Sequence, residues 1–167
     1  MRPVTGVAGT SQQLEFFMRC RVLAILAFLA VVLASAASAQ DRDYVNGRSA
    51  SDADAPPFSG AVWVGPTLYL AGTLGLAPDR SVPATATEEA HNVLGNMKAV
   101  LEEAGLTMDD LVSVQIFSSD VSDYDAFNAV YRTYFTKTYP ARAFIGAGTL
   151  LFGARFEVMG IATRAGS

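Results

Sequence analysis

The sequence has one cysteine and one histidine in 167 residues, and this scarcity excludes several kinds of site. Cys20 stands just before the apolar run 22–33, so removal of an N-terminal leader would leave a domain without thiols, disulfides or thiolate ligands. His91 lies beside Glu88 and Glu89 in a predicted helix, with no further ligands at the close spacing of a metal site. We therefore expect no metal, and we interpret His91 as a solvated helix residue.

Basic residues are also scarce. Beyond residue 39 the chain has 9 Lys and Arg against 15 Asp and Glu, and no Lys/Arg cluster. Such a chain repels phosphate backbones, so nucleic acid is not an expected partner. The sequence also lacks a P-loop, a Rossmann fingerprint, Gly-x-Ser-x-Gly and His-Glu-x-x-His.

The first 39 residues have the pattern of a signal peptide. Arg19 and Arg21 precede the apolar run 22–33, which continues into small residues ending at Ala37-Ser38-Ala39. The run is shorter than the roughly 20 residues needed to cross a bilayer, so no stable membrane anchor is expected after cleavage. We predict an exported protein, periplasmic or secreted. Because Met18 is a natural start, residues 1–17 are either an upstream extension or the result of a start codon chosen too early.

The remaining chain is one domain's length. Residues 40–55 are polar and predict a flexible lead-in, and residues 56–165 predict a folded domain. Its expected elements, in chain order, are strands at 59–64 and 67–73, a helix from Thr85 to 104, a strand at 111–117, a helix capped by Ser122, and strands at 143–147 and 156–162. The order ββ-α-β-α-ββ predicts an α+β two-layer sandwich with both helices on one face of a sheet.

Apolar residues are expected on both faces of that sheet. Trp63, Tyr69, Ile116 and Ile145 lie in the predicted strands, and two helices cover only one face. Self-association would cover the other face.

Arg142 and Glu157 stand out because charged side chains are costly in otherwise apolar strands. Arginine binds a carboxylate bidentately, and glutamate can hold and polarise a water molecule. The alternative is a structural Arg–Glu ion pair. The Asp residues of the domain fall in predicted loops and helix caps. Solvation and interaction with the helix dipole explain them there better than paired-carboxylate catalysis does.

Between about Pro57 and Arg164 the chain contains a series of distinctive segments: Pro57-Phe58-Ser59, Ala71-Gly72, residues 96–106, Phe127-Asn128-Ala129-Val130-Tyr131, Tyr134-Phe135, Pro140-Ala141-Arg142, and Glu157-Val158 with Ile161-Ala162. These segments resemble those of the RidA/YjgF family of enamine/imine deaminases, also called endoribonuclease L-PSP-like. Their order and the spacing from Arg142 to Glu157 carry the resemblance.

The resemblance implies a chorismate-mutase-like fold, a homotrimer with clefts between subunits, and a hydrolase of the 2-iminobutanoate/2-iminopropanoate deaminase type. Such an enzyme converts 2-imino acids to 2-keto acids and ammonia without a cofactor. Arg142 would clamp the substrate carboxylate, Glu157 would position the attacking water, and the main chain around Phe144 would help hold that water. Phe58, Ala71 and Gly72 would line the substrate pocket.

The sequence departs from the family pattern at four pocket positions. Phe58 replaces a Tyr, Ala71 a Ser, Thr73 a residue that is often Gln, and Met159 a second Glu. Losing a hydroxyl donor costs on the order of 1 kcal/mol, so we expect weaker activity on small imino acids, or a preference for bulkier, more apolar ones. The alternative function is a non-catalytic trimeric binder of small carboxylates. Ribonuclease and holdase roles have also been attached to the family; the acidic mature chain disfavours the first.

Overall fold

The computed structural model describes residues 15–16, 18 and 41–164. The chain divides into two compact units, residues 1–39 and 40–167. The predicted signal peptide belongs to the first unit and lies outside the described residues, apart from 15, 16 and 18. None of the helices among the described residues is both long and apolar enough to cross a membrane.

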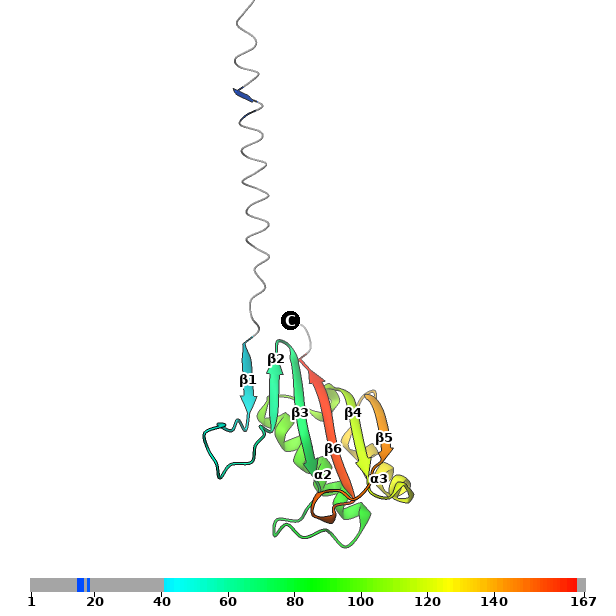
Figure 1. Cartoon of the computed structure of the whole chain (residues 1–167). Helices are drawn as coiled ribbons and strands as arrows, with labels where there is room; N and C mark the ends of the chain where they lie inside the picture. Colours follow the sequence, from blue (N-terminus) through cyan, green and yellow to red (C-terminus); the bar gives the residue numbers. More distant parts are fainter. Residues whose placement is uncertain (1–14, 17, 19–40, 165–167) are drawn as a thin grey trace, which may run out of the picture. The chain divides into compact units, whose positions relative to one another are not determined.

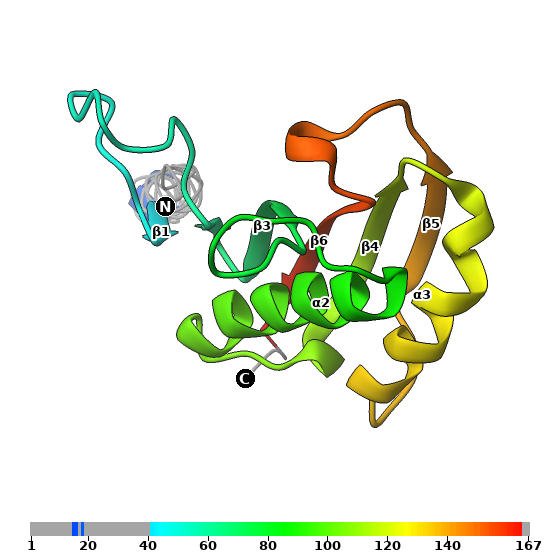
Figure 2. The same cartoon turned by 90° about the horizontal axis from the view of Figure 1, so that it is seen from below.

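The second unit is a six-stranded sheet with two α-helices on one face (Figures 1 and 2). The strands are ordered β1-β2-β3-β6-β4-β5, and only the β4–β5 pair is parallel. The elements are β1 Arg42–Val45, β2 Ala61–Val64, β3 Thr67–Leu74, α2 Ala86–Glu103, β4 Leu111–Ser118, α3 Tyr124–Tyr131, β5 Ala141–Gly146 and β6 Phe156–Thr163. The predicted α+β class is thus correct.

Helix α2 forms as its sequence pattern predicts. Thr85 and Glu88 make a reciprocal capping box, in which each side chain accepts a hydrogen bond from the other's backbone N–H. Gly105, at φ 75°, provides the left-handed turn that ends the helix. The stripe at 3- and 4-residue spacing faces the sheet and is buried: Ala90, Val93, Leu94, Met97 and Leu101.

Helix α3 begins differently from the prediction. A short 3-10 turn, Val121–Asp123, precedes it, and the side chain of Asp120, not of Ser122, accepts the capping hydrogen bond at 2.8 Å from the Ser122 N–H. A second 3-10 turn, Arg132–Tyr134, follows the helix.

The prediction of a flexible lead-in at 40–55 is wrong for residues 42–45. These residues form β1, which pairs antiparallel with β2 at the sheet edge. The sequence of β1, Arg-Asp-Tyr-Val, has almost no alternation of hydrophobic and polar residues, and only Val45 is buried. Pairing with β2, rather than burial, explains this strand.

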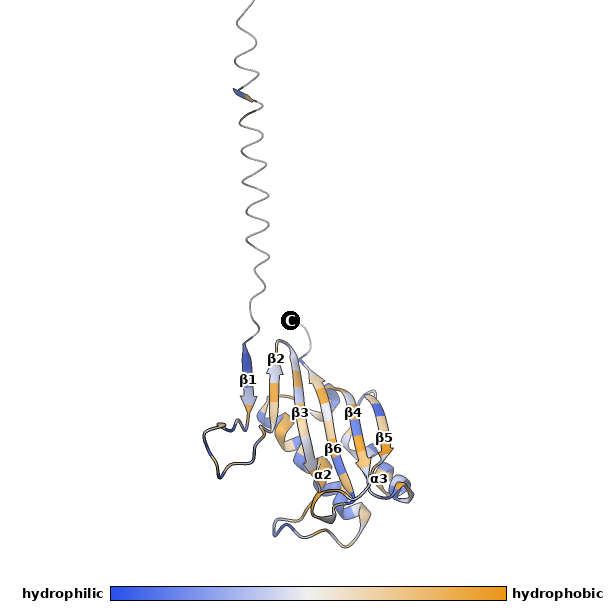
Figure 3. Ribbon diagram, viewed as in Figure 1, coloured by the Kyte–Doolittle hydropathy of each residue, from blue (hydrophilic) through white to orange (hydrophobic). Residues whose placement is uncertain are grey.

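The two faces of the sheet differ in a way that the sequence did not resolve. Trp63 and Ile116 are 5% and 0% exposed and belong to the face that the helices cover. Tyr69 and Ile145 lie on the open face and are exposed. Figure 3 shows the resulting alternation of hydrophobic and hydrophilic residues along the strands.

Candidate active site

Arg142 lies on the edge strand β5 with its side chain on the helical face. In register it pairs with Val114, which is buried under the helices. Its Nη1 donates a hydrogen bond of 2.7 Å to Oδ1 of Asn128 on α3. Its guanidinium carbon lies 4.7 Å from the ring centroid of Tyr131 and 5.8 Å from that of Tyr124. These contacts fix the orientation of the guanidinium and leave most of its N–H donors free.

A pocket of about 220 Å³ opens beside this arginine. It is lined by Tyr124, Asn128, Tyr131, Arg132, Tyr139, Pro140 and Arg142. The hydroxyl of Tyr131 is buried and has no hydrogen-bond partner within the described part of the chain. Burial raises the pKa of Tyr131 to about 12, so this hydroxyl remains protonated and able to donate at neutral pH.

The main chain of β5 is open at the sheet edge. The N–H of Ala147 donates to the carbonyl of Ser118 on β4, at 2.8 Å. Because alternate residues of a strand direct their backbone groups to opposite sides, the N–H and C=O of Phe144 and Arg142 point away from β4. The half-buried Phe144 ring packs against the rings of Tyr124 and Phe127, with centroids 5.1 and 5.8 Å apart, and its main chain faces the open edge.

Glu157 lies on the opposite face of the sheet. It follows the buried Phe156 in β6 and pairs in register with Leu74 and Phe117. Its carboxylate sits directly over Gly72, so closely that a Cβ at Gly72 would overlap with it and lie 3.1 Å from Glu157 Cδ. Glycine at this position is what lets the carboxylate lie against β3.

Phe58, Ala71 and Gly72 line one small pocket of about 100 Å³, whose remaining walls are largely apolar. The predicted site residues therefore form two groups. In the first, Phe58 and Ala71 share with Gly72 a pocket beside α2, and Glu157 contacts Gly72 from the open face of the sheet. The second is Arg142 with Phe144. A single chain does not bring the two groups together. The alternative of an Arg142–Glu157 ion pair is wrong for the single chain, since among the residues described Arg142 bonds to Asn128 and Glu157 forms no ion pair.

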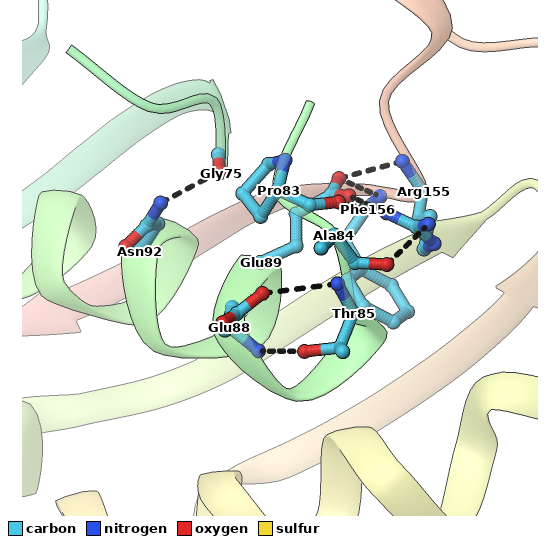
Figure 4. A network of polar contacts seen from close by, with 9 residues as sticks. All are labelled: Gly75, Pro83, Ala84, Thr85, Glu88, Glu89, Asn92, Arg155 and Phe156. Atoms are coloured by element: carbon cyan, nitrogen blue, oxygen red, sulfur yellow. Dashed lines mark hydrogen bonds and ion pairs between the residues drawn. The ribbon is translucent and has the colours of Figure 1, made fainter. Parts of the chain in front are cut away.

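Sequence reasoning missed a polar network that anchors β6 (Figure 4). Glu89 of α2 is fully buried; its Oε1 accepts hydrogen bonds from the backbone N–H of Arg155 and of Phe156, at 2.6 and 3.0 Å. Its Oε2 forms an ion pair of 3.0 Å with the Arg155 guanidinium, which also donates to the carbonyls of Pro83 and Ala84. The network therefore fixes the chain immediately before Glu157.

Asn128, Tyr131 and Tyr124 are not among the site residues predicted from the sequence. Their spacing of 4 and 3 positions places them on one face of α3, and a polar Asn within an aromatic stripe was the available signal. Within the described part of the chain, no group of three or more His, Cys, Asp or Glu side chains is placed to hold a metal ion.

The fold and the site define an α+β protein with an arginine at one sheet edge and a carboxylate on the open face. Residues 49–164 match the family model described as Endoribonuclease L-PSP, and the chain belongs to this family, which includes the RidA proteins. The resemblance noted in the sequence is thus confirmed.

Two relatives are named 2-iminobutanoate/2-iminopropanoate deaminase. The protein of the mite Dermatophagoides farinae is 38% identical over 107 residues, which cover 63% of this chain and 84% of the relative. The human protein is 34% identical over 121 residues, covering 69% and 88%.

Solved structures of the family share the fold. YyfA of Yersinia pestis, a member of the Rid family, is 29% identical with a TM-score of 0.66, covering 74% of this chain and all of that one. TdcF of Escherichia coli, solved with bound serine, is 28% identical with a TM-score of 0.63, covering 66% and 91%.

Proposed function

We propose that this protein hydrolyses reactive 2-imino acids to 2-keto acids and ammonia. The observation that carries the proposal is the guanidinium of Arg142, oriented by Asn128 and two rings, with free donors beside an open pocket. Membership of the family and the names of its relatives support deamination as the reaction. The N-terminal pattern supports export as the setting.

In this proposal Arg142 binds the substrate carboxylate. A guanidinium fork makes two parallel hydrogen bonds to a carboxylate and so fixes both its position and its plane. The exposed main chain of Phe144, two residues along the same edge, would hold the attacking water or the substrate.

Glu157 would orient the water that attacks the imine carbon. The water oxygen bonds to that carbon, the C=N bond is replaced by C=O, and nitrogen leaves as ammonia with the protons of the water. An imine carbon is already electrophilic, so positioning and one polarising carboxylate supply much of the catalysis.

We further propose that the site is completed between subunits of a homotrimer. Within one chain, Arg142 and Glu157 lie on opposite faces of the sheet, two strands apart in the order β6-β4-β5. Apposition of the β5 edge of one subunit with the Gly72–Glu157 surface of another would unite them. The same contact would cover the exposed Tyr69 and Met159.

The non-catalytic binder is the second candidate. The pocket at Ala71 and Gly72 is mostly apolar and lacks the hydroxyls that the family pattern would supply there. This observation favours binding without efficient turnover.

The decisive experiment measures imine hydrolysis by the chain from residue 40 onward, which is a compact unit of its own. An amino-acid oxidase generates 2-imino acids in situ, and semicarbazide traps the imine that remains. We expect acceleration over buffer, and a loss of about 10²-fold in kcat/KM in Arg142→Gln, because a charge-assisted bidentate contact contributes about 3 kcal/mol.

Arg42→Gln is the matched control, because Arg42 is exposed on β1, at the sheet edge opposite β5. No acceleration on any imino acid, together with binding of 2-keto acids that depends on Arg142, would select the binder instead.

Gly72→Ala tests the second half of the site. The new methyl group displaces only the flexible end of Glu157, so we expect a change below about 1 kcal/mol in unfolding free energy. Turnover should nevertheless fall at least tenfold, because the carboxylate leaves its position. Urea denaturation and the trapping assay measure the two effects. An active Gly72→Ala variant would contradict the placement of Glu157 against β3 as part of the site.

A further inference from the structure

The pocket beside Arg142 holds a second guanidinium. Arg132, from the 3-10 turn that follows α3, lines the same space of about 220 Å³. The other lining residues are three tyrosines, an asparagine and a proline, so the wall carries no carboxylate. Within the part of the chain that the structure describes, neither Arg132 nor Arg142 forms an ion pair.

Two uncompensated cations in one pocket are unexpected in an acidic protein. Beyond residue 39, carboxylates outnumber Lys and Arg by 15 to 9, yet none lines this pocket. Like charges that share a pocket repel one another, and they do so more strongly where aromatic walls lower the local dielectric. An anion that bridges both guanidiniums removes this repulsion and gains two charge-assisted contacts.

We propose that this pocket selects dianionic substrates, namely the 2-imino dicarboxylic acids derived from acidic amino acids. This inference rests on the proposed function and assigns its substrate class. Arg142 binds the carboxylate next to the imine carbon, and Arg132 binds the side-chain carboxylate. The reaction is the same hydrolysis of the imine to a keto group and ammonia, and the side-chain carboxylate does not take part in it.

The remaining features of the pocket fit such a ligand. Its volume corresponds to about seven waters at ~30 Å³ each, which is the scale of a small dicarboxylic acid. The buried, protonated hydroxyl of Tyr131 lacks an acceptor, and a ligand carboxylate would supply one. Phe58 and Ala71 are the residues from which a preference for more apolar imino acids is expected. They line the other pocket and do not line this one.

Calorimetric titration with two stable 2-keto acids of equal chain length tests the selectivity without turnover. We expect 2-oxoglutarate to bind at least tenfold more tightly than 2-oxopentanoate, with a preference that falls as salt is raised. Arg132→Gln should remove the preference and leave the Kd of 2-oxopentanoate within twofold. Arg132→Lys should retain part of the preference, and the control Arg42→Gln should retain all of it. Equal affinities in the wild-type protein, or equal weakening of both acids in Arg132→Gln, would overturn the inference.

Turnover separates this inference from the proposed function. Glutamate oxidase and alanine-oxidising enzymes supply 2-iminoglutarate and 2-iminopropionate to the trapping assay. If both imines are hydrolysed without preference for the dianion, the selectivity is wrong and deamination stands. If neither is hydrolysed while 2-oxoglutarate still binds through Arg132, the deaminase proposal is wrong and the pocket is a dicarboxylate-binding site.

Discussion

Glu157→Gln should lower the rate of imine hydrolysis by about 10²- to 10⁴-fold, the range typical of a general base in proteins. Glutamine has the same size and still fits against Gly72, but it cannot accept a proton from the attacking water. Binding of a 2-keto acid, measured by calorimetry, should change little, because Arg142 is unaltered. Glu102→Gln is the matched control, since this glutamate is exposed and, among the residues that the structure describes, forms its ion pair with Lys98 on the surface of α2.

Mixing two inactive variants tests whether the site is shared. When Arg142→Gln and Glu157→Gln subunits are unfolded and refolded together in equal amounts, about a quarter of the interfaces should join an intact Arg142 to an intact Glu157, provided that assembly is random. Activity should therefore return to about a quarter of the wild-type level. A mixture without activity would place both residues of a site in one subunit and contradict the proposed apposition. A fully active Glu157→Gln variant would remove Glu157 from the mechanism.

The fold was predictable wherever local patterns were strong. Helix α2 combines a capping box with an uninterrupted apolar stripe, and both features depend only on neighbouring residues. Strand β1 was not predictable, because pairing with β2 holds it in place while three of its four residues are exposed. The face on which each apolar strand residue lies was also not predictable, because a single sequence does not say which face of a strand the helices cover.

The candidate site was predictable by residue type but not by geometry. Arg142 and Glu157 are charged residues in apolar strands, which is a signal visible in the sequence. That they occupy opposite faces depends on strand order and register, which bring β6 beside β4 and place β5 at the edge. Arg132 looked like any exposed cation at a helix end, and only the pocket shows that it shares a wall with Arg142.

Glu89→Ala should be the most destabilising single change in the polar network. It leaves the backbone N–H groups of Arg155 and Phe156 without an acceptor and the Arg155 guanidinium without its carboxylate. Breaking a buried ion pair by removing one partner costs about 3 to 5 kcal/mol; because the Arg155 side chain is 30% exposed, we expect about 3 kcal/mol. Urea denaturation followed by circular dichroism measures this loss as a lower midpoint with an unchanged slope.

The neighbouring glutamate provides the control for this prediction. Glu88→Ala removes only the exposed half of the capping box and should cost a few tenths to about 1 kcal/mol. Glu89→Gln should fall between the two, because its carbonyl oxygen can still accept from the backbone while its amide faces Arg155. In Glu89→Ala molecules that remain folded, turnover should also fall, since the network holds the first residues of β6 just before Glu157. Equal stability losses in Glu88→Ala and Glu89→Ala would mean that the buried ion pair stabilises the fold no more than the exposed cap does. Packing of the buried Phe156 and Val158 would then be sufficient to hold β6 in place.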